Sequence, residues 1–242
     1  MSGENLPLAE PLIIGEPYLL SAFSPIAATF RFIERDLRGA LLPLFGCAVV
    51  GSLETLSLLL GLARDWRMIL ALVAVWLPIS SYCGASMLAF ALRVMRGQPY
   101  RPREVWRYHP STPHFAGLKL LSYSLFAGLA YAAGKLVARA AKLSPALPFL
   151  VVALAMLLGL VLFVRLCLAP VVIVDRRVNA LEAVRASLLL TRGQTVALAI
   201  YGIVLTMIAG MSQAICGLAV LNTLATPGLV YLYQTLRGEP PG

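Results

Sequence analysis

Apolar positions dominate six long stretches of the chain, which short polar segments separate. The stretches cover approximately residues 40–62, 68–92, 115–137, 147–170, 195–215 and 218–236. The separation between the last two, near Cys216 and Gly217, is the least distinct. A helix needs about 20 apolar residues to cross a hydrocarbon core of roughly 30 Å. The pattern therefore predicts an all-α membrane protein with six transmembrane helices arranged as three hairpins.

A short amphipathic segment precedes each predicted hairpin. The first begins near residue 24, with Pro25 at a position that proline favours, and the second begins at Pro102. In the third, Asn179 and Glu182 have the spacing of a capping box, and Gly193 is placed to end the helix. We interpret all three as cytoplasmic interfacial helices. Their starts, near residues 24, 102 and 180, lie 78 residues apart both times. This regularity indicates a three-fold internal repeat, although hairpins and loops of equal length produce the same spacing without one.

The basic residues fall mainly on one side of the predicted membrane. With six spans, the N-terminus, the second and fourth loops and the C-terminus share a side that holds thirteen arginines, against four basic residues opposite. Loops rich in Lys and Arg stay in the cytoplasm, so both termini are predicted to be cytoplasmic. The thirteen are Arg31, Arg35, Arg38, Arg93, Arg96, Arg101, Arg103, Arg107, Arg176, Arg177, Arg185, Arg192 and Arg237; the four are Arg64, Arg67, Arg139 and Lys142.

Composition narrows the class of protein further. Of the 242 residues, 60% are hydrophobic and 13% are charged, which excludes an ordinary soluble domain and also intrinsic disorder. The mean hydropathy is +0.83. The net charge of +9 is spread over several loops, so it does not indicate nucleic-acid binding. Residues 1–23 are predicted to form an extended cytoplasmic tail without a signal peptide, residues 24–237 a single transmembrane domain, and residues 238–242 a C-terminal tail.

Ionisable residues inside the predicted spans are candidates for a polar cluster. Glu54 and Lys135 lie at comparable depth in the first and third spans, and Gln213 and Asn222 lie near the same level. Charges at membrane depth face the bundle interior or a polar cavity by default. Two interpretations stay open: a salt bridge that fixes helix packing, or a polar site that opens outward. Lys119 lies near the cytoplasmic boundary, where we expect its side chain to extend to the membrane surface.

Arginines flank the predicted interfacial segments. In the simplest interpretation these arginines position the helix bundle at the boundary of the lipid headgroups. The alternative is that they bind anionic lipid headgroups specifically. The candidate headgroup contacts are Arg93, Arg96, Arg101, Arg103, Arg107, Arg176 and Arg177. In the third span, Ala130, Gly134 and Ala138 form a small-xxx-small ladder, which permits close helix approach within the bundle or to a neighbouring subunit.

Motifs of known chemistry are missing from the sequence. It contains no Walker A, GxSxG, GxGxxG or HExxH pattern. The four cysteines have no paired spacing, and the two histidines, His109 and His114, share one loop without a Cys cluster or an acidic metal motif. We therefore expect no catalytic, cofactor or metal site, and no enzyme.

Residues 165–194, RLCLAPVVIVDRRVNALEAVRASLLLTRGQ, carry a family resemblance. The segment resembles a signature of the membrane domain that occurs alongside glycerophosphoryl diester phosphodiesterases and in related uncharacterised bacterial polytopic membrane proteins. In that signature a span ends in an LAP-type sequence, followed by a strand-like exit and an LEA-R-S helix. The entry FRFIERDLRGALLPL and the close YLYQTLRGE are similar to those of the same group.

The resemblance implies a six-span helical domain with no catalytic residues to carry over. It also implies that several residues of the segment stabilise the junction between the fourth and fifth spans, where Asn179 is the expected helix cap. The junction residues are Asp175, Glu182, Arg185, Ser187, Thr191 and Arg192.

These observations lead to an expected function. The absence of reactive motifs favours a non-enzymatic, multi-pass protein of a bacterial inner membrane. We expect it to be a scaffold or accessory subunit, with the lipid bilayer and other membrane protein subunits as its partners. Two alternatives are a small transporter or lipid-handling protein that uses the outward polar cluster, and a membrane anchor for a separately encoded hydrolase.

Overall fold

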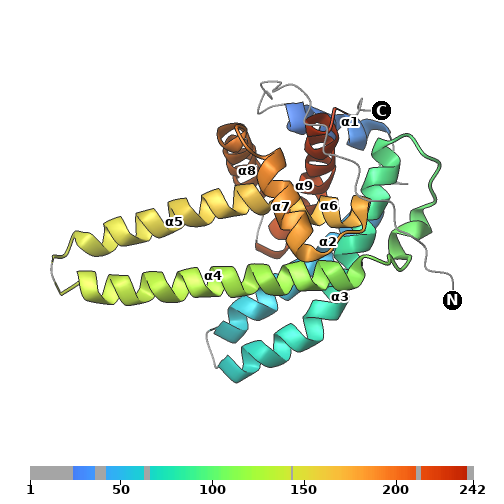
Figure 1. The fold of residues 1–242 in the computed structure, drawn as a ribbon. Coiled ribbons are helices and arrows are strands. Elements are labelled where there is room, and N and C mark those ends of the chain that lie inside the picture. The colour runs from blue at the N-terminus through green and yellow to red at the C-terminus, as the bar shows by residue number, and fades with distance from the viewer. Residues whose placement is uncertain (1–23, 36–41, 63–65, 143, 211–213, 239–242) are drawn as a thin grey trace.

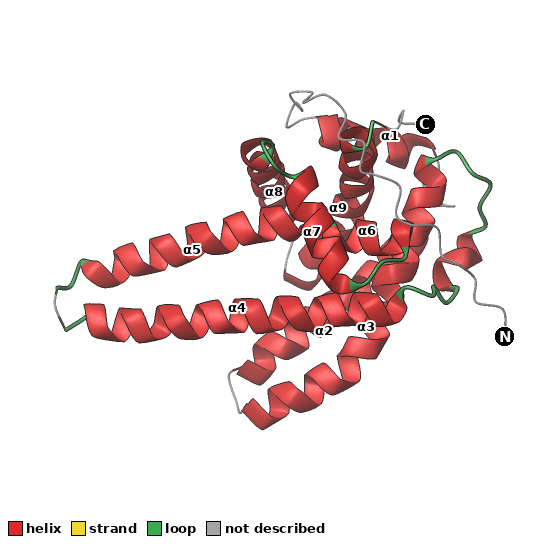
Figure 2. Ribbon diagram, viewed as in Figure 1, coloured by secondary structure: helices red, strands yellow, loops and turns green. Residues whose placement is uncertain are grey.

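The structure is a computed structural model that describes residues 24–35, 42–62, 66–142, 144–210 and 214–238. Every regular element in these ranges is a helix and none is a strand, which confirms the predicted all-helical fold (Figure 2). The predicted tail of residues 1–23 lies outside the described residues.

Helices occupy all six predicted apolar stretches. They pair in sequence as α2 (Leu42–Leu62) with α3 (Trp66–Met95), α4 (Thr112–Ala140) with α5 (Leu147–Leu166), and α8 (Thr195–Gly210) with α9 (Ala214–Leu236). Within the described residues, three helical segments are long and apolar enough to cross a membrane: Arg67–Met95, Thr112–Ala140 and Leu147–Arg176. The length and composition of these segments are those expected of a membrane protein.

The segments that precede the hairpins are helical as well. They form α1 (Ser24–Arg35), the 3-10 helix η2 (Pro102–Trp106) and α7 (Ala180–Leu190). The α7 start is set locally, because the Asn179 side chain accepts a 2.9 Å hydrogen bond from the backbone N–H of Glu182. The chain leaves α7 through Gly193, whose φ of +83° requires the freedom of glycine. η2 has only five residues, against twelve in α1 and eleven in α7.

The family resemblance implied a strand-like segment after the fourth apolar stretch, and this expectation is wrong. α5 ends at Leu166 and a new helix, α6 (Ala169–Arg176), follows directly. Pro170 lies in the first turn of α6, where proline fits because its missing N–H has no partner to lose. The β-branched run from Val171 to Val174 is typical of a strand. Its side chains are fully buried by neighbouring helices, so tertiary packing overrides the local preference.

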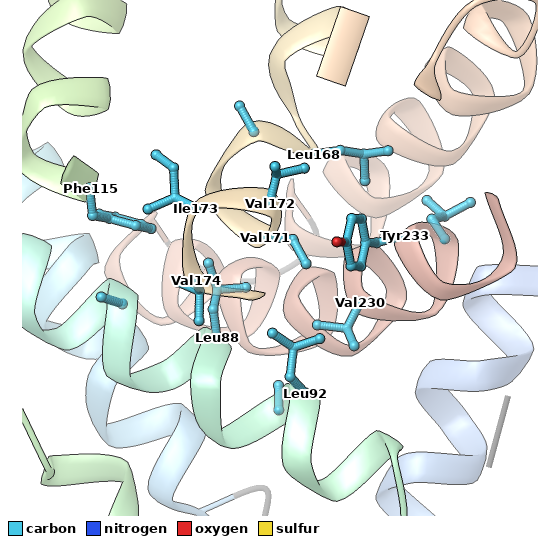
Figure 3. Packing of buried hydrophobic residues seen from close by; sticks show 14 of the residues in the cluster. Leu88, Leu92, Phe115, Leu168, Val171, Val172, Ile173, Val174, Val230 and Tyr233 are labelled. Atoms are coloured by element: carbon cyan, nitrogen blue, oxygen red, sulfur yellow. The ribbon is translucent and has the colours of Figure 1, made fainter. Parts of the chain in front are cut away.

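The core of the molecule is built around α6. Val171, Val172 and Ile173 are in contact with the C-terminal halves of α3 and α9 and the start of α4, as Figure 3 shows. Gly84 of α3 permits close approach, because a Cβ there would lie 2.7 Å from the ring of Phe115. In contrast, Figure 1 shows the α4–α5 hairpin extending away from this core. None of the apolar window of α4 is buried.

Candidate functional site

A polar cluster joins α2, α3 and α4 at Glu54. One Glu54 carboxylate oxygen lies 2.6 Å from Lys119 Nζ, and the other accepts a 2.7 Å hydrogen bond from the Tyr123 hydroxyl. Lys119 Nζ also donates to Ser80 Oγ at 2.6 Å. The Glu54 side chain is only 5% exposed. Both carboxylate oxygens therefore have a protein partner, which favours the packing interpretation over an open site.

Lys135, the candidate partner of Glu54 in the predicted cluster, does not pair with it, because Lys119 occupies that position. Lys135 lies sixteen residues beyond Lys119 on α4, about 24 Å along the helix axis. It is exposed, with its Nζ 5.5 Å from the centre of the Tyr131 ring. The prediction assumed that the helices start at one level, whereas Lys119, in the second turn of α4, meets Ser80 in the middle of α3.

Sequence spacing contained a signal for the correct partner. Lys119 and Tyr123 are four residues apart on α4, so they share one helix face. Of the other predicted cluster members, Gln213 lies outside the described residues, and the side chain of Asn222 does too.

A cavity of about 340 Å³ lies beside the C-terminal end of α3. It is enclosed by that end of α3, by η2 with the loop after it, and by the C-terminal end of α6. Four of the seven arginines predicted to contact headgroups line it: Arg93, Arg96, Arg107 and Arg177. Arg101, Arg103 and Arg176 are not part of its lining.

Asp175 holds one wall of this cavity in place. Its carboxylate is 2.7 Å from Arg96, directly after α3, 2.7 Å from Arg237, directly after α9, and accepts a 2.7 Å hydrogen bond from the Tyr233 hydroxyl. The side chain of Asp175 is 8% exposed. The resemblance placed Asp175 at the junction of the fourth and fifth spans, and the structure shows that it ties α6 to α3 and α9.

His109 is an uncharged member of the cavity wall. Burial lowers its pKa, and the nearby charges of Arg177 and Arg93 lower it further, so the ring is neutral at pH 7. The backbone N–H of Ser111 lies 3.3 Å from Nδ1 and donates to it. The neutral ring consequently carries its proton on Nε2, which leaves one N–H donor.

The junction helix α7 packs through small residues. Ala183, Ala186 and Ser187 are buried, and Ser187 Oγ donates to the Arg165 carbonyl at 2.7 Å. Thr191 is also buried, and its hydroxyl donates to the Ser187 carbonyl at 2.8 Å. The remaining predicted junction residues, Glu182, Arg185 and Arg192, have exposed side chains, and Glu182 contributes its backbone N–H to the cap.

The small-residue ladder of α4 faces outward. Ala130, Gly134 and Ala138 are all exposed, and a Cβ added at Gly134 would meet nothing within 4 Å. α4 contacts α5 elsewhere, where Leu129 lies 3.6 Å from the Cβ position of Gly159. The ladder is therefore not used for packing against the described helices of this chain.

The described residues contain no group of three or more His, Cys, Asp or Glu that would hold a metal ion. Comparison of the chain with protein-family models, with curated proteins and with solved structures gives no match. The resemblance to the phosphodiesterase-associated membrane domain thus stays a prediction.

Proposed function

We propose that this protein is a non-enzymatic, six-span subunit of a membrane protein assembly in a bacterial inner membrane. In this proposal α4 is the helix that contacts the neighbouring subunit, through the face that carries Ala130, Gly134 and Ala138. The observation that carries the proposal is the open space at Gly134, where no described side chain of this chain approaches within 4 Å of the Cβ position.

The chemistry of this face fits a helix partner better than lipid alone. Small residues four apart let two helix backbones approach closely, and such ladders are enriched where transmembrane helices associate. Lys135 adjoins the ladder and is exposed on a helix whose apolar window is otherwise unburied. A cation within a span is costly in hydrocarbon unless its side chain reaches the interface or a polar partner. A neighbouring helix that packs against the small residues and places an acceptor near Lys135 accounts for both the ladder and the exposed lysine.

The proposal is tested by comparing two glycines of α4. Gly128 and Gly134 are both exposed and open at their Cβ positions, but six residues place them about 120° apart around the helix. We expect Gly134→Leu to dissociate the native assembly and Gly128→Leu to leave it intact. The measurement is the mass of the complex purified in mild detergent, with identification of every chain in it.

Two results contradict the proposal: a wild-type protein that is a lone monomer in both mild detergent and lipid nanodiscs, or an assembly that survives Gly134→Leu. The proposal holds whether the partner is a second copy of this chain or a different subunit. Identification of the chains in the complex distinguishes these two cases. A hydrolase among them would support the anchor alternative. The transporter alternative receives no support from Glu54, because Lys119 and Tyr123 occupy its carboxylate.

A further inference from the structure

The arginine-lined cavity carries more positive charge than its own carboxylates neutralise. Its wall contains four arginines, Arg93, Arg96, Arg107 and Arg177, and two carboxylates, Glu104 and Asp175. Four positive charges less two negative charges leave an excess of +2, since His109 is neutral at pH 7. This excess is independent of the α4 face discussed above.

The pairing of the arginines divides them into two kinds. Arg96 lies 2.7 Å from Asp175, and Arg93 lies 3.2 Å from Glu104, so carboxylates hold both in position. Arg107 and Arg177 form no ion pair with any residue that the structure describes, and both are exposed. The cavity thus combines two anchored guanidinium groups with two that are available to a ligand.

The backbone that carries the two available arginines is itself fixed. Ser86 Oγ of α3 donates a 2.8 Å hydrogen bond to the Arg107 carbonyl, and the Tyr82 hydroxyl donates to the carbonyl of the preceding residue, Trp106. Arg177 ends α6 with a left-handed φ of 54°, and its N–H donates to the Ile173 carbonyl at 2.9 Å. Both positions are therefore built into the fold and do not belong to a free loop.

We infer that this cavity binds a phosphate-bearing anion, with Arg107 and Arg177 as its principal ligands. Guanidinium groups present paired N–H donors that match phosphate oxygens, and they stay charged at all physiological pH values. The Nε2–H of His109 adds a neutral donor on the same wall. A volume of about 340 Å³ accommodates a headgroup-sized ligand and not a whole lipid.

Two sources supply this chemistry: the headgroup of an anionic phospholipid, and a free phosphate compound. Tyr108 of the cavity wall is 60% exposed, and Trp106 beside it is 47% exposed. Exposed Trp and Tyr are typical of the membrane–water interface, which places the cavity at headgroup depth in the proposed topology. The test therefore uses a separate probe for each of the two sources, the lipid headgroup and the free phosphate compound.

The test measures binding to the full-length protein in neutral detergent by titration calorimetry. The probes are inorganic phosphate, short-chain phosphatidylglycerol and, as the zwitterionic reference, short-chain phosphatidylcholine. The test variant is Arg107→Gln with Arg177→Gln, and the matched control is Arg101→Gln with Arg103→Gln. The control removes the same charge from arginines that are outside the cavity lining.

We expect the test variant to bind the anionic probe at least about tenfold more weakly than wild type, with the control within about threefold. Binding of inorganic phosphate identifies a free phosphate compound as ligand, and binding of phosphatidylglycerol alone identifies a lipid headgroup. The inference is overturned if neither anionic probe binds wild type more tightly than phosphatidylcholine. It is also overturned if both variants, with thermal unfolding unchanged, lose binding equally. Neither result depends on whether Gly134→Leu dissociates an assembly.

Discussion

The most apolar window among the described helices is little buried, whereas a less apolar window in α3 is buried to a greater extent. The segment Leu147–Arg176 contains a window of mean hydropathy 2.9, of which only 6% is buried, whereas the window in Arg67–Met95 has a mean hydropathy of 1.8 and is 22% buried. The buried part of α3 contains small and polar residues such as Ser81, Ala85 and Ser86. In a bilayer, lipid solvates apolar side chains as well as a protein core does, so a high hydropathy does not by itself indicate burial inside the protein.

The largest contrast is expected between the two lysines of α4, Lys119 at the buried start of the helix and Lys135 at its exposed far end. Glu54→Gln leaves the mostly buried Lys119 without its counter-charge, and we expect a loss of about 3 kcal/mol in the free energy of unfolding. Lys135→Gln removes an exposed charge and should change this free energy by less than about 0.5 kcal/mol. Thermal unfolding in detergent measures both.

A double-variant cycle sharpens this contrast. Glu54→Gln combined with Lys119→Gln removes both charges, so the loss should be smaller than the sum of the two single losses. Strictly additive losses would show that the two side chains do not interact, and an equal loss for Lys135→Gln would remove the distinction between the two regions.

A smaller effect is expected at Asp175, where the core meets the arginine-lined cavity. Asp175→Asn removes the charge that joins Arg96 and Arg237, and we expect a loss of about 2 kcal/mol. The matched control is Glu104→Gln, whose partner Arg93 is 47% exposed, and its loss should stay below about 1 kcal/mol. Thermal unfolding in detergent measures both variants. Equal losses in the free energy of unfolding would mean that Asp175 does not tie the helices together.

The smallest effect tests packing with one substitution at two glycines. Gly84→Ala places a Cβ against the ring of Phe115, and we expect a loss of about 1 kcal/mol from overpacking. Gly134→Ala meets open space, and the higher helix propensity of alanine should leave the monomer unchanged or up to about 1 kcal/mol more stable. Unfolding shifts of the same sign in the monomeric protein would contradict the structure.

Local features of the fold were predictable because their causes are local. The apolar stretches, the Asn179 cap and the start of η2 at Pro102 depend on residues within a few positions of one another. The strand-like exit that the family resemblance implied is a helix, α6, because the surrounding helices bury its β-branched run, although such residues favour a strand locally. Seven arginines were candidate headgroup contacts, but nothing local distinguishes the four that enclose the cavity.

The sequence by itself determined that this chain is helical and apolar enough for a membrane, and it determined where most of its helices lie. The tertiary structure decided which charges meet. We expected the Lys119 side chain to extend to the membrane surface, but it pairs with Glu54 because the first turns of α4 lie beside the middle of α3. Where the two helices cross, Gly84 of α3 leaves room for the ring of Phe115 of α4. Such contacts join residues far apart in the chain. Hydrophobic periodicity indicates only which environment each helix face meets, so it does not predict these contacts.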